Sequence, residues 1–466
     1  MTRQLQSRPS MPRRPRVPSA ARGSVLVIVM WICLGLVALT LYFANSMNSE
    51  FHAADNRVNE IAARQAVTAG IRYAEYVLKQ YAVGGAVPNI EDYKAEALPV
   101  GDASFWFIGR DNDDAQQAQA TEPYFALVDE ASKLNLNTAT ATMLQALPLP
   151  DMTQDIATAI VAWRGNGQNA ANYENSYAQL TPPRHNKGAA YETIDELRLV
   201  YGASLDVLLG EDTNRNGVLD PNENDGETSA PRDDQNGTLQ AGLLEYVTVY
   251  TREPTTSAAG SRRINVTQLN TQQTQQQLQQ RLTQRGITTQ RANQILQRVR
   301  QVANQNPNQS PFNSVAEFMV TTQMTADEFA LVHTEFTGTS AQGLINVNTA
   351  SAAVLGCIPG IGPDNASMLV SYRAAHPEAL TSFAWLTQVL PAASVRQAGR
   401  YITDQSYQFS ADIAAVGANG RGYCREKVVF DMSTGTPRII YRQDLTAYGW
   451  ALGVQAHRTL RGPKET

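Results

Sequence analysis

The feature that most constrains this chain is an uninterrupted apolar run near its amino terminus. Residues 24–44 read SVLVIVMWICLGLVALTLYFA without a charged side chain, and the first acid after them is Glu50. About 20 apolar residues in an α-helix cross the roughly 30 Å hydrocarbon core of a bilayer. A cleaved secretory signal is the alternative, but the run is too long for one and no small-residue cleavage site follows it. The sequence therefore predicts a single-pass membrane anchor.

The charges on either side of the run predict its orientation. Residues 1–23 carry six arginines and no acid, so the rest of the 466-residue chain has a net charge of −11, against −5 for the whole. Basic flanks favour the cytoplasmic side of a membrane, so we expect the bulk of the chain on the outer side. An acidic body also speaks against tight nucleic-acid binding, which needs a positive surface.

Beyond the run, the sequence predicts that the same helix continues outside the membrane. Between residues 53 and 81, apolar residues recur at helical spacing with no Pro, and Gly84 and Gly85 follow. We therefore expect one rod, with residues 24–49 starting in the membrane and residues 50–83 outside it. The glycine pair would end this helix.

Aromatic and β-branched segments predict an antiparallel sheet that is split in the sequence. The expected strands are residues 103–109, 124–128, 407–415, 423–430 and 438–442. The first two would form a hairpin with Asp111, Asp113 and Asp114 in its turn. A long helix packed on such a sheet is an α+β fold, an arrangement that resembles the pilin fold. Residues 96–129 and 403–466 would supply the sheet, and residues 130–402 would form a large helical insert.

The insert contains an internal repeat. Residues 134–139 read LNLNTA, residues 345–350 read INVNTA, and residues 264–267 (INVT) begin like a degenerate third copy. Each full copy precedes a predicted helix, with Thr138 and Thr349 as candidate N-caps. The two helical units are expected over residues 130–202 and 343–392. Between them, residues 271–309 are rich in Gln and Asn and predict either a helix or a polar linker.

One turn in the second unit resembles the hairpin of helix–hairpin–helix (SAM-like) domains. Residues 358–362 read IPGIG, and Pro363 suits the first turn of the next helix. Such glycines let a backbone approach a phosphate. The flanking Asp364 and the acidic body favour a platform for protein contacts. A membrane-anchored DNA receptor, similar to competence proteins, is the alternative function.

A further segment fits the pattern of a calcium-binding loop. Six residues at the expected spacing would supply oxygen ligands: Asp212, Asn214, Asn216, Val218 through its carbonyl, Asp220 and Glu223. Gly217 would permit the sharp turn. A metal-free turn rich in Asp and Asn is the alternative interpretation. Calcium here would fasten residues 212–223 as a structural clip.

Arg22, Gly23 and Ser24, placed before an uncharged helix, resemble the leader of type IV prepilins, which a membrane peptidase cuts between Gly23 and Ser24. Most of that superfamily has Glu at the fifth mature position, where this chain has Ile28. That difference, the repeated insert and segments such as 194–200 (IDELRLV) resemble the K class of type II secretion minor pseudopilins. The resemblance implies an inner-membrane tip subunit of a periplasmic pseudopilus. Its partners would be the prepilin peptidase, the inner-membrane assembly platform, other minor pseudopilins and the major pseudopilin.

Other residues offer little chemistry. The five histidines lack metal-ligand spacing, and no nucleophile or nucleotide-binding motif is present, so we expect no enzymatic activity. Cys33 lies in the apolar run. Cys357 and Cys424 could form one disulfide or remain free thiols.

Overall fold

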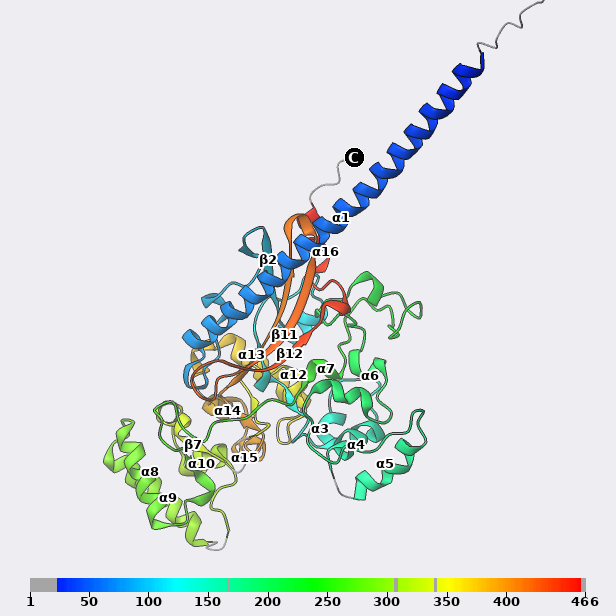
Figure 1. The fold of residues 1–466 in the computed structure, drawn as a ribbon. Coiled ribbons are helices and arrows are strands. Elements are labelled where there is room, and N and C mark those ends of the chain that lie inside the picture. Colours follow the sequence, from blue (N-terminus) through cyan, green and yellow to red (C-terminus); the bar gives the residue numbers. More distant parts are fainter. Residues whose placement is uncertain (1–22, 112, 166–167, 306–308, 339–341, 462–466) are drawn as a thin grey trace, which may run out of the picture. The chain divides into compact units, whose positions relative to one another are not determined.

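The computed structural model describes residues 23–111, 113–165, 168–305, 309–338 and 342–461 (Figure 1). Its contacts divide the chain into two compact units, residues 1–58 and 59–466. Helix α1 (Gly23–Tyr81) contains the predicted apolar run and ends before the predicted glycine pair. The most apolar 18-residue window of α1 has a mean hydropathy of 2.7 and is wholly exposed, so this helix could span a membrane. The predicted long amino-terminal helix is confirmed.

The second unit contains an antiparallel sheet with strands from both ends of the sequence. Its order is β1 (Leu98–Val100), β2 (Ala103–Ile108), β10 (Gln408–Val416), β11 (Tyr423–Asp431) and β12 (Arg438–Asp444), and β3 (Val128–Asp129) also pairs with β10. The central pairing of β2 with β10 joins residues about 300 positions apart, with Phe105 opposite Ala415. Together with α1 and the insert, this sheet gives the α+β fold that the sequence predicts and that is consistent with a pilin-like fold.

One face of the sheet packs against residues 63–78 of α1 and the segment after the helix. Alternate strand residues point to this face, as the two-residue period of a strand requires. The face is lined by Phe105, Phe107, Phe409, Ile413 and Phe430. The helix meets them with small residues such as Ala66 and Gly70. A Cβ at Gly70 would lie 2.8 Å from Cγ2 of Ile413, so glycine permits the close approach.

The predicted hairpin of residues 103–109 and 124–128 is wrong. Strand β2 pairs with β1 and β10, and only Val128 of the second segment enters a strand, β3. The acidic turn instead precedes α2 (Asp114–Ala118), where the Asp113 carboxylate accepts from Ala115 N at 3.0 Å. Because Asp serves equally as a turn residue and as a helix N-cap, the sequence did not separate the two.

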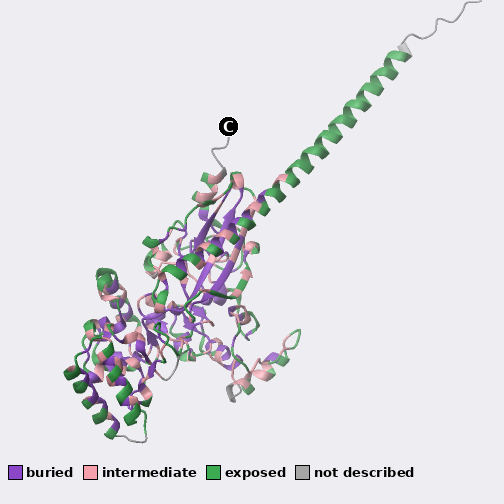
Figure 2. Ribbon diagram, turned by 60° about the vertical axis from the view of Figure 1, so that its left-hand side comes forward, coloured by how far each residue is buried: buried purple, intermediate pink, exposed green. Residues whose placement is uncertain are grey.

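The insert contains short helices. They are α3 (Ala141–Gln145), α4 (Gln154–Trp163), α5 (Gln168–Ala178), α6 (Leu205–Leu209), α7 (Leu243–Tyr246), α8 (Gln272–Gln284), α9 (Thr289–Gln305), α10 (Val315–Thr322), α11 (Ala326–Ala330), α12 (Ala352–Gly356), α13 (Gly362–Ala375), α14 (Leu386–Val389) and α15 (Ala392–Ala398), and α16 (Gly453–Arg461) follows the sheet. The inner faces of α3 to α15 share one hydrophobic core, whose buried residues are among those coloured purple in Figure 2. The segment of residues 271–309, rich in Gln and Asn, contains the helices α8 and α9.

Three parallel strand pairs open and close the copies of the repeat. The pairs are β4 (Leu134–Asn135) with β5 (Val247–Thr248), β6 (Ile264–Asn265) with β7 (Phe336–Thr337), and β8 (Ile345–Asn346) with β9 (Ile402–Thr403). Each opening strand ends in Asn and each closing strand ends in Thr. The segment at 264–267 thus begins a unit with the same strand pair as the two full copies.

The predicted N-caps Thr138 and Thr349 are wrong by two residues. Thr140 caps α3 and Ser351 caps α12. The Thr349 hydroxyl instead donates to the buried Asp129 carboxylate at 2.5 Å. In these two copies the Asn–Thr pair forms a tight turn first, so the helix begins two residues later than the sequence suggested.

Two consecutive acids, the last residue of β3 and the one after it, join the insert to the sheet. Counted along the chain, the copies begin at β4 (first), β6 (middle) and β8 (third). Asp129 Oδ2 accepts from Thr349 and from Ser406 Oγ at 2.6 Å, which attaches the third copy. Glu130 accepts from the Thr248 hydroxyl on β5, which attaches the first copy, and its Oε1 lies 3.6 Å from Lys427 Nζ. Burial raises the pKa of Asp129 to about 6. At Glu130, burial opposes the neighbouring lysines, and the net pKa is lowered.

Candidate cation-binding loop

The predicted loop at residues 212–223 is folded inward. It runs from just after α6 to a short 3₁₀ turn at Pro221–Glu223. All six candidate ligand residues are buried, in sequence order Asp212, Asn214, Asn216, Val218, Asp220 and Glu223. Burial of so many polar side chains is costly unless each one finds a partner.

Backbone N–H groups satisfy the first part of the loop. Asp212 accepts from Asn216 N and Gly217 N, both at 2.9 Å, while Asn214 Oδ1 accepts from Asn216 N at 3.0 Å. The turn needs left-handed backbone at Arg215 (φ 58°) and Gly217 (φ 76°). The left-handed backbone favours glycine at position 217, as the sequence pattern predicts, and a Cβ there would also lie 2.6 Å from Nε2 of Gln117.

Two amide side chains converge on one carboxylate oxygen. Asp220 Oδ2 accepts from Asn214 Nδ2 at 2.7 Å and from Asn216 Nδ2 at 3.0 Å. These side chains are the ones that the sequence pattern assigns to alternate ligand positions. Their convergence brings amide and carboxylate groups of the predicted set together in the loop.

Glu223 closes the loop by accepting from backbone. Its Oε1 accepts from Thr213 N at 2.8 Å and its Oε2 accepts from Asp220 N at 3.1 Å. Burial and the nearby Asp212 carboxylate raise the pKa of Glu223 to about 7. Burial also raises the pKa of Asp212 and of Asp220. Each shift reflects an anion that is disfavoured in its surroundings and that a bound cation would favour.

The donor chemistry of the loop fits a hard cation, since it consists of carboxylate, amide and carbonyl oxygens. Among the residues that the structure describes, no three His, Cys, Asp or Glu side chains gather closely enough to hold a metal ion. A cation held here would therefore depend on the amide oxygens of Asn214 and Asn216 and on the Val218 carbonyl as well as on carboxylates.

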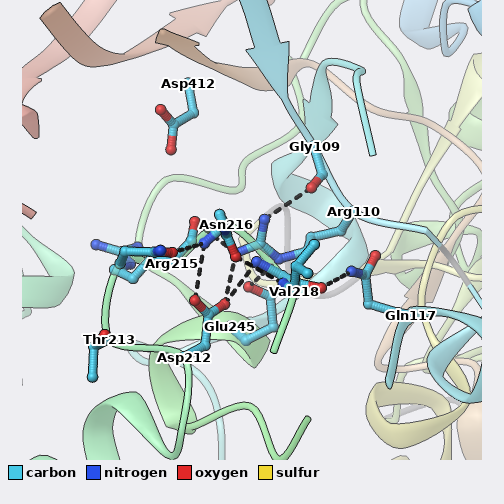
Figure 3. A network of polar contacts seen from close by, with 12 residues as sticks. Gly109, Arg110, Gln117, Asp212, Thr213, Arg215, Asn216, Val218, Glu245 and Asp412 are labelled. Atoms are coloured by element: carbon cyan, nitrogen blue, oxygen red, sulfur yellow. Dashed lines mark hydrogen bonds and ion pairs between the residues drawn. The ribbon is translucent and has the colours of Figure 1, made fainter. Parts of the chain in front are cut away.

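Two arginines that sequence reasoning missed fasten the loop to the sheet. Arg425 is buried, and Arg110, which Figure 3 shows beside the loop, is half-buried. Arg425 on β11 binds both carboxylate oxygens of Asp412 at 2.7 and 2.8 Å and donates to Arg215 O at 2.8 Å. Arg110 follows β2, pairs with Glu245 at 2.8 Å and also donates to Arg215 O at 3.0 Å. The sequence signal that could have identified Arg425 was an arginine at an inward-facing position of an apolar predicted strand, in the segment YCREKVVF.

The candidate processing site lies at the start of α1. Gly23 is the first described residue and opens the helix, and Ser24 follows within it. Arg22 and the rest of residues 1–22 lie outside the described part of the chain. Cleavage between Gly23 and Ser24 stays a prediction.

The possible disulfide between Cys357 and Cys424 is not formed, because both are free thiols. Cys357 belongs to the core of the insert, whereas Cys424 lies on β11 beside the core between α1 and the sheet. Burial raises the pKa of Cys357 to about 12, so its thiol is protonated and unreactive at neutral pH.

The glycine hairpin of residues 358–362 packs against the insert itself. Gly360 (φ 93°) and Gly362 (φ 75°) adopt left-handed backbone between α12 and α13. A Cβ on Gly360 would lie 2.8 Å from the Ser394 carbonyl oxygen in α15. This glycine therefore allows the hairpin to pack closely against α15.

Comparisons with known proteins bear on the fold alone. No protein-family model matches the chain, and a search of curated proteins finds no match. A search of solved structures matches a chain from the crystal structure of the GspK-GspI-GspJ complex of the enterotoxigenic Escherichia coli Type 2 Secretion System. The match is 11% identical, covers 85% of this chain and 98% of that chain, and has a TM-score of 0.35. Such a score is too low to support a function, which therefore rests on features of the chain itself.

Proposed function

We propose that this chain is a membrane-anchored, pilin-like subunit of a secretion fibre. The observation that carries the proposal is α1, a single helix that begins apolar and exposed and whose residues 63–78 pack on an antiparallel sheet. The Arg22–Gly23–Ser24 leader before this helix supports the same class.

Within that class, the chain would be a minor pseudopilin similar to the K class of type II secretion. It would start or cap the pseudopilus and support export of folded proteins across the outer membrane. Two features support a tip position. Ile28 cannot form the charge pair that a Glu would make with a neighbour's amino terminus. The insert between β3 and β10 is bulky enough to hinder stacking of a further subunit. The other pseudopilins, the assembly platform and the prepilin peptidase would be its partners, with its bulk in the periplasm.

Calcium would act in this protein as a structural clip. Asp212, Asp220 and Glu223 would supply carboxylate oxygens, and Asn214, Asn216 and the Val218 carbonyl would supply the others. The bound charge would offset the repulsion and desolvation that raise the pKa values of the three acids. The loop would then hold the first copy of the repeat firmly against Arg110 and Arg425.

Intact-mass analysis after co-expression with a prepilin peptidase tests the class. We expect loss of residues 1–23, and we expect Gly23→Val to abolish that loss. Gly35→Val is the matched control, because Gly35 lies in the same helix with open space around it and should leave processing unchanged. An uncut wild-type chain would reduce α1 to an ordinary anchor and would reopen the alternative of a DNA receptor.

Co-purification tests the finer assignment. Co-expressed with the other pseudopilins of its own secretion system, the solubilised chain should form a complex with minor pseudopilins and should occur once per fibre. Recovery of the chain at many copies along a fibre would contradict a tip position.

A further inference from the structure

The middle copy of the repeat contains a polar cleft that the proposed secretion role does not use. The cleft has a volume of about 610 Å³ and lies along α8, beside the strand pair β6–β7. Five glutamines, three arginines and three threonines make up most of its described lining, which contains no Asp or Glu. Ile264 is the single apolar side chain among these lining residues.

A row of glutamines forms one wall of the cleft. Gln273, Gln277, Gln280 and Gln284 are spaced by four, three and four residues, so they lie on one face of α8. Within the described part of the chain, none of their side-chain amides has a hydrogen-bond partner. The opposite face of α8 is buried through Leu278 and Leu282. The apolar face holds the helix in place, and the amide row, about 16 Å long, faces the cleft.

The cleft carries an excess of positive charge. Residues 254–316 hold seven arginines and no Asp, Glu or Lys, within a chain whose net charge is −5. Arg281 and Arg285 both bind the buried Glu335 carboxylate, so one of their two charges is not balanced. The exposed Arg262 has no ion pair among the described residues.

Buried polar contacts support the floor of the cleft. Arg263 is almost fully buried, pairs with Glu253 at 2.8 Å and donates to Gln405 at 2.7 Å. Its Nε is buried without a hydrogen-bond partner among the described residues. An unsatisfied guanidinium N–H is costly, and it adds positive potential next to the cleft.

We propose that this cleft binds an acidic oligosaccharide built of hexuronate units. A primary amide offers a donor and an acceptor side by side, which matches neighbouring hydroxyls of a sugar ring. A guanidinium group matches a carboxylate. The amide row with Arg262 and Arg281 at the same cleft therefore presents both kinds of contact along a length suited to several sugar units.

Other ligand classes fit the lining less well. Single-stranded nucleic acids bind mainly by base stacking on aromatic side chains, and no aromatic residue is among the described lining. A protein partner would need an apolar anchor, and Ile264 alone does not supply one.

Isothermal titration of the full-length chain in detergent micelles with hexagalacturonate tests this proposal. We expect saturable binding, which Arg262→Ala weakens by roughly tenfold, the loss typical of a charge-assisted hydrogen bond. The double variant Gln277→Ala with Gln280→Ala should weaken it by a similar factor. Maltohexaose, which has the hydroxyls without the carboxylates, should bind at least roughly tenfold more weakly.

Matched controls separate the cleft from general effects of charge or folding. Arg400→Ala and Gln297→Ala remove an exposed Arg and an exposed Gln outside the lining and should leave the affinity unchanged. Absence of binding at millimolar hexagalacturonate would overturn the proposal. So would equal losses in the control variants, or equal affinity for an oligoglutamate of the same charge, since that would indicate a non-selective basic surface.

Discussion

The first and third copies of the repeat hold their opening turns with matching side-chain contacts. Asn135 and Asn346 accept from the N–H two residues further on, at 2.8 and 2.9 Å. Each also donates to a hydroxyl beyond the closing strand, Thr251 and Ser406, at 2.8 Å in both cases. In the first and third copies, one buried amide thus joins the start of the copy to its end.

The second asparagine of each copy ties the turn to a later segment. Asn137 donates to Tyr191 O and accepts from Tyr191 N, at 3.0 and 2.7 Å. Asn348 donates to Leu380 O at 3.1 Å and accepts from the Trp385 indole N–H at 2.8 Å. Similar contacts therefore recur at positions more than 200 residues apart.

The middle copy retains only the first part of this pattern. Asn265 accepts from Thr267 N at 3.0 Å, and Thr267 stands where the other copies have their second Asn. Its stability comes instead from longer helices, since α8 and α9 pack Leu282 and Ile295 into the common core. The comparison teaches that the asparagines specify the turns, while apolar burial can replace them as the source of stability.

The largest effect should come from removing the best-connected asparagine. Asn346→Ala would delete a fully buried amide, leave the Asn348 N–H without its acceptor, and remove the donor from which the Ser406 hydroxyl accepts. Buried unsatisfied groups cost about 1–3 kcal/mol each. We expect Asn346→Ala to lower the free energy of unfolding by about 3–4 kcal/mol and Asn265→Ala to lower it by about 1 kcal/mol. Urea denaturation followed by Trp fluorescence measures both, and equal losses would contradict the difference between the copies.

The two acids that attach the copies to the sheet should respond to pH in opposite directions. The pKa of Asp129 is raised to about 6, so its stabilising contribution is present below about pH 4 and is lost as pH rises through 6. Between pH 4 and pH 7, the free energy of unfolding of the wild-type chain should therefore fall by up to about 3 kcal/mol relative to that of Asp129→Asn.

Glu130→Gln is the control for this pH experiment. Because the pKa of Glu130 is lowered, its contribution is present at neutral pH and is lost on acidification. As pH rises, the free energy of unfolding of the wild-type chain should increase relative to that of Glu130→Gln. Unfolding curves of the wild type and the two variants at both pH values check this. A stability difference between wild type and Asp129→Asn that does not change with pH would refute the raised pKa of Asp129.

A third pair of variants tests whether the equivalent arginines of the two copies, Arg373 and Arg164, contribute equally to stability. Arg373 donates to Ala350 O at 2.5 Å and to Val347 O at 3.2 Å, and Arg164 donates to the corresponding Ala139 O at 2.6 Å. Burial lowers the pKa of Arg373 to about 10, while Nη1 of Arg164 is buried with no hydrogen-bond partner among the described residues. We expect Arg373→Met to cost about 2 kcal/mol and Arg164→Met less than about 1 kcal/mol in urea denaturation. A larger loss for Arg164→Met would reverse the ranking of the two sites.

Features that depend on local periodicity were predictable from the sequence. The α1 helix and the strands β10, β11 and β12 lie close to their predicted positions, because apolar spacing alone defines them. The partner of β2 was not predictable, because its pairing with β10 depends on a contact across the whole insert. For the same reason the sequence indicated the loop at 212–223 but not Arg110 and Arg425, which reach it from distant segments.

The loop at residues 212–223 is the clearest difference between the first copy and the third. Calcium removal tests whether an ion bound in this loop stabilises the folded chain. If calcium binds the folded loop, the folded state gains RT ln(1 + [Ca²⁺]/Kd), about 1.4 kcal/mol at ten times Kd. We expect millimolar calcium to raise Tm, EDTA to reverse the rise, and Asp220→Asn to abolish it. Asp151→Asn, an exposed change in the same copy, should keep the response. An equal response in Asp220→Asn would place the cation elsewhere, and no response in the wild-type chain would leave the buried acids held by Arg110, Arg425 and the backbone alone.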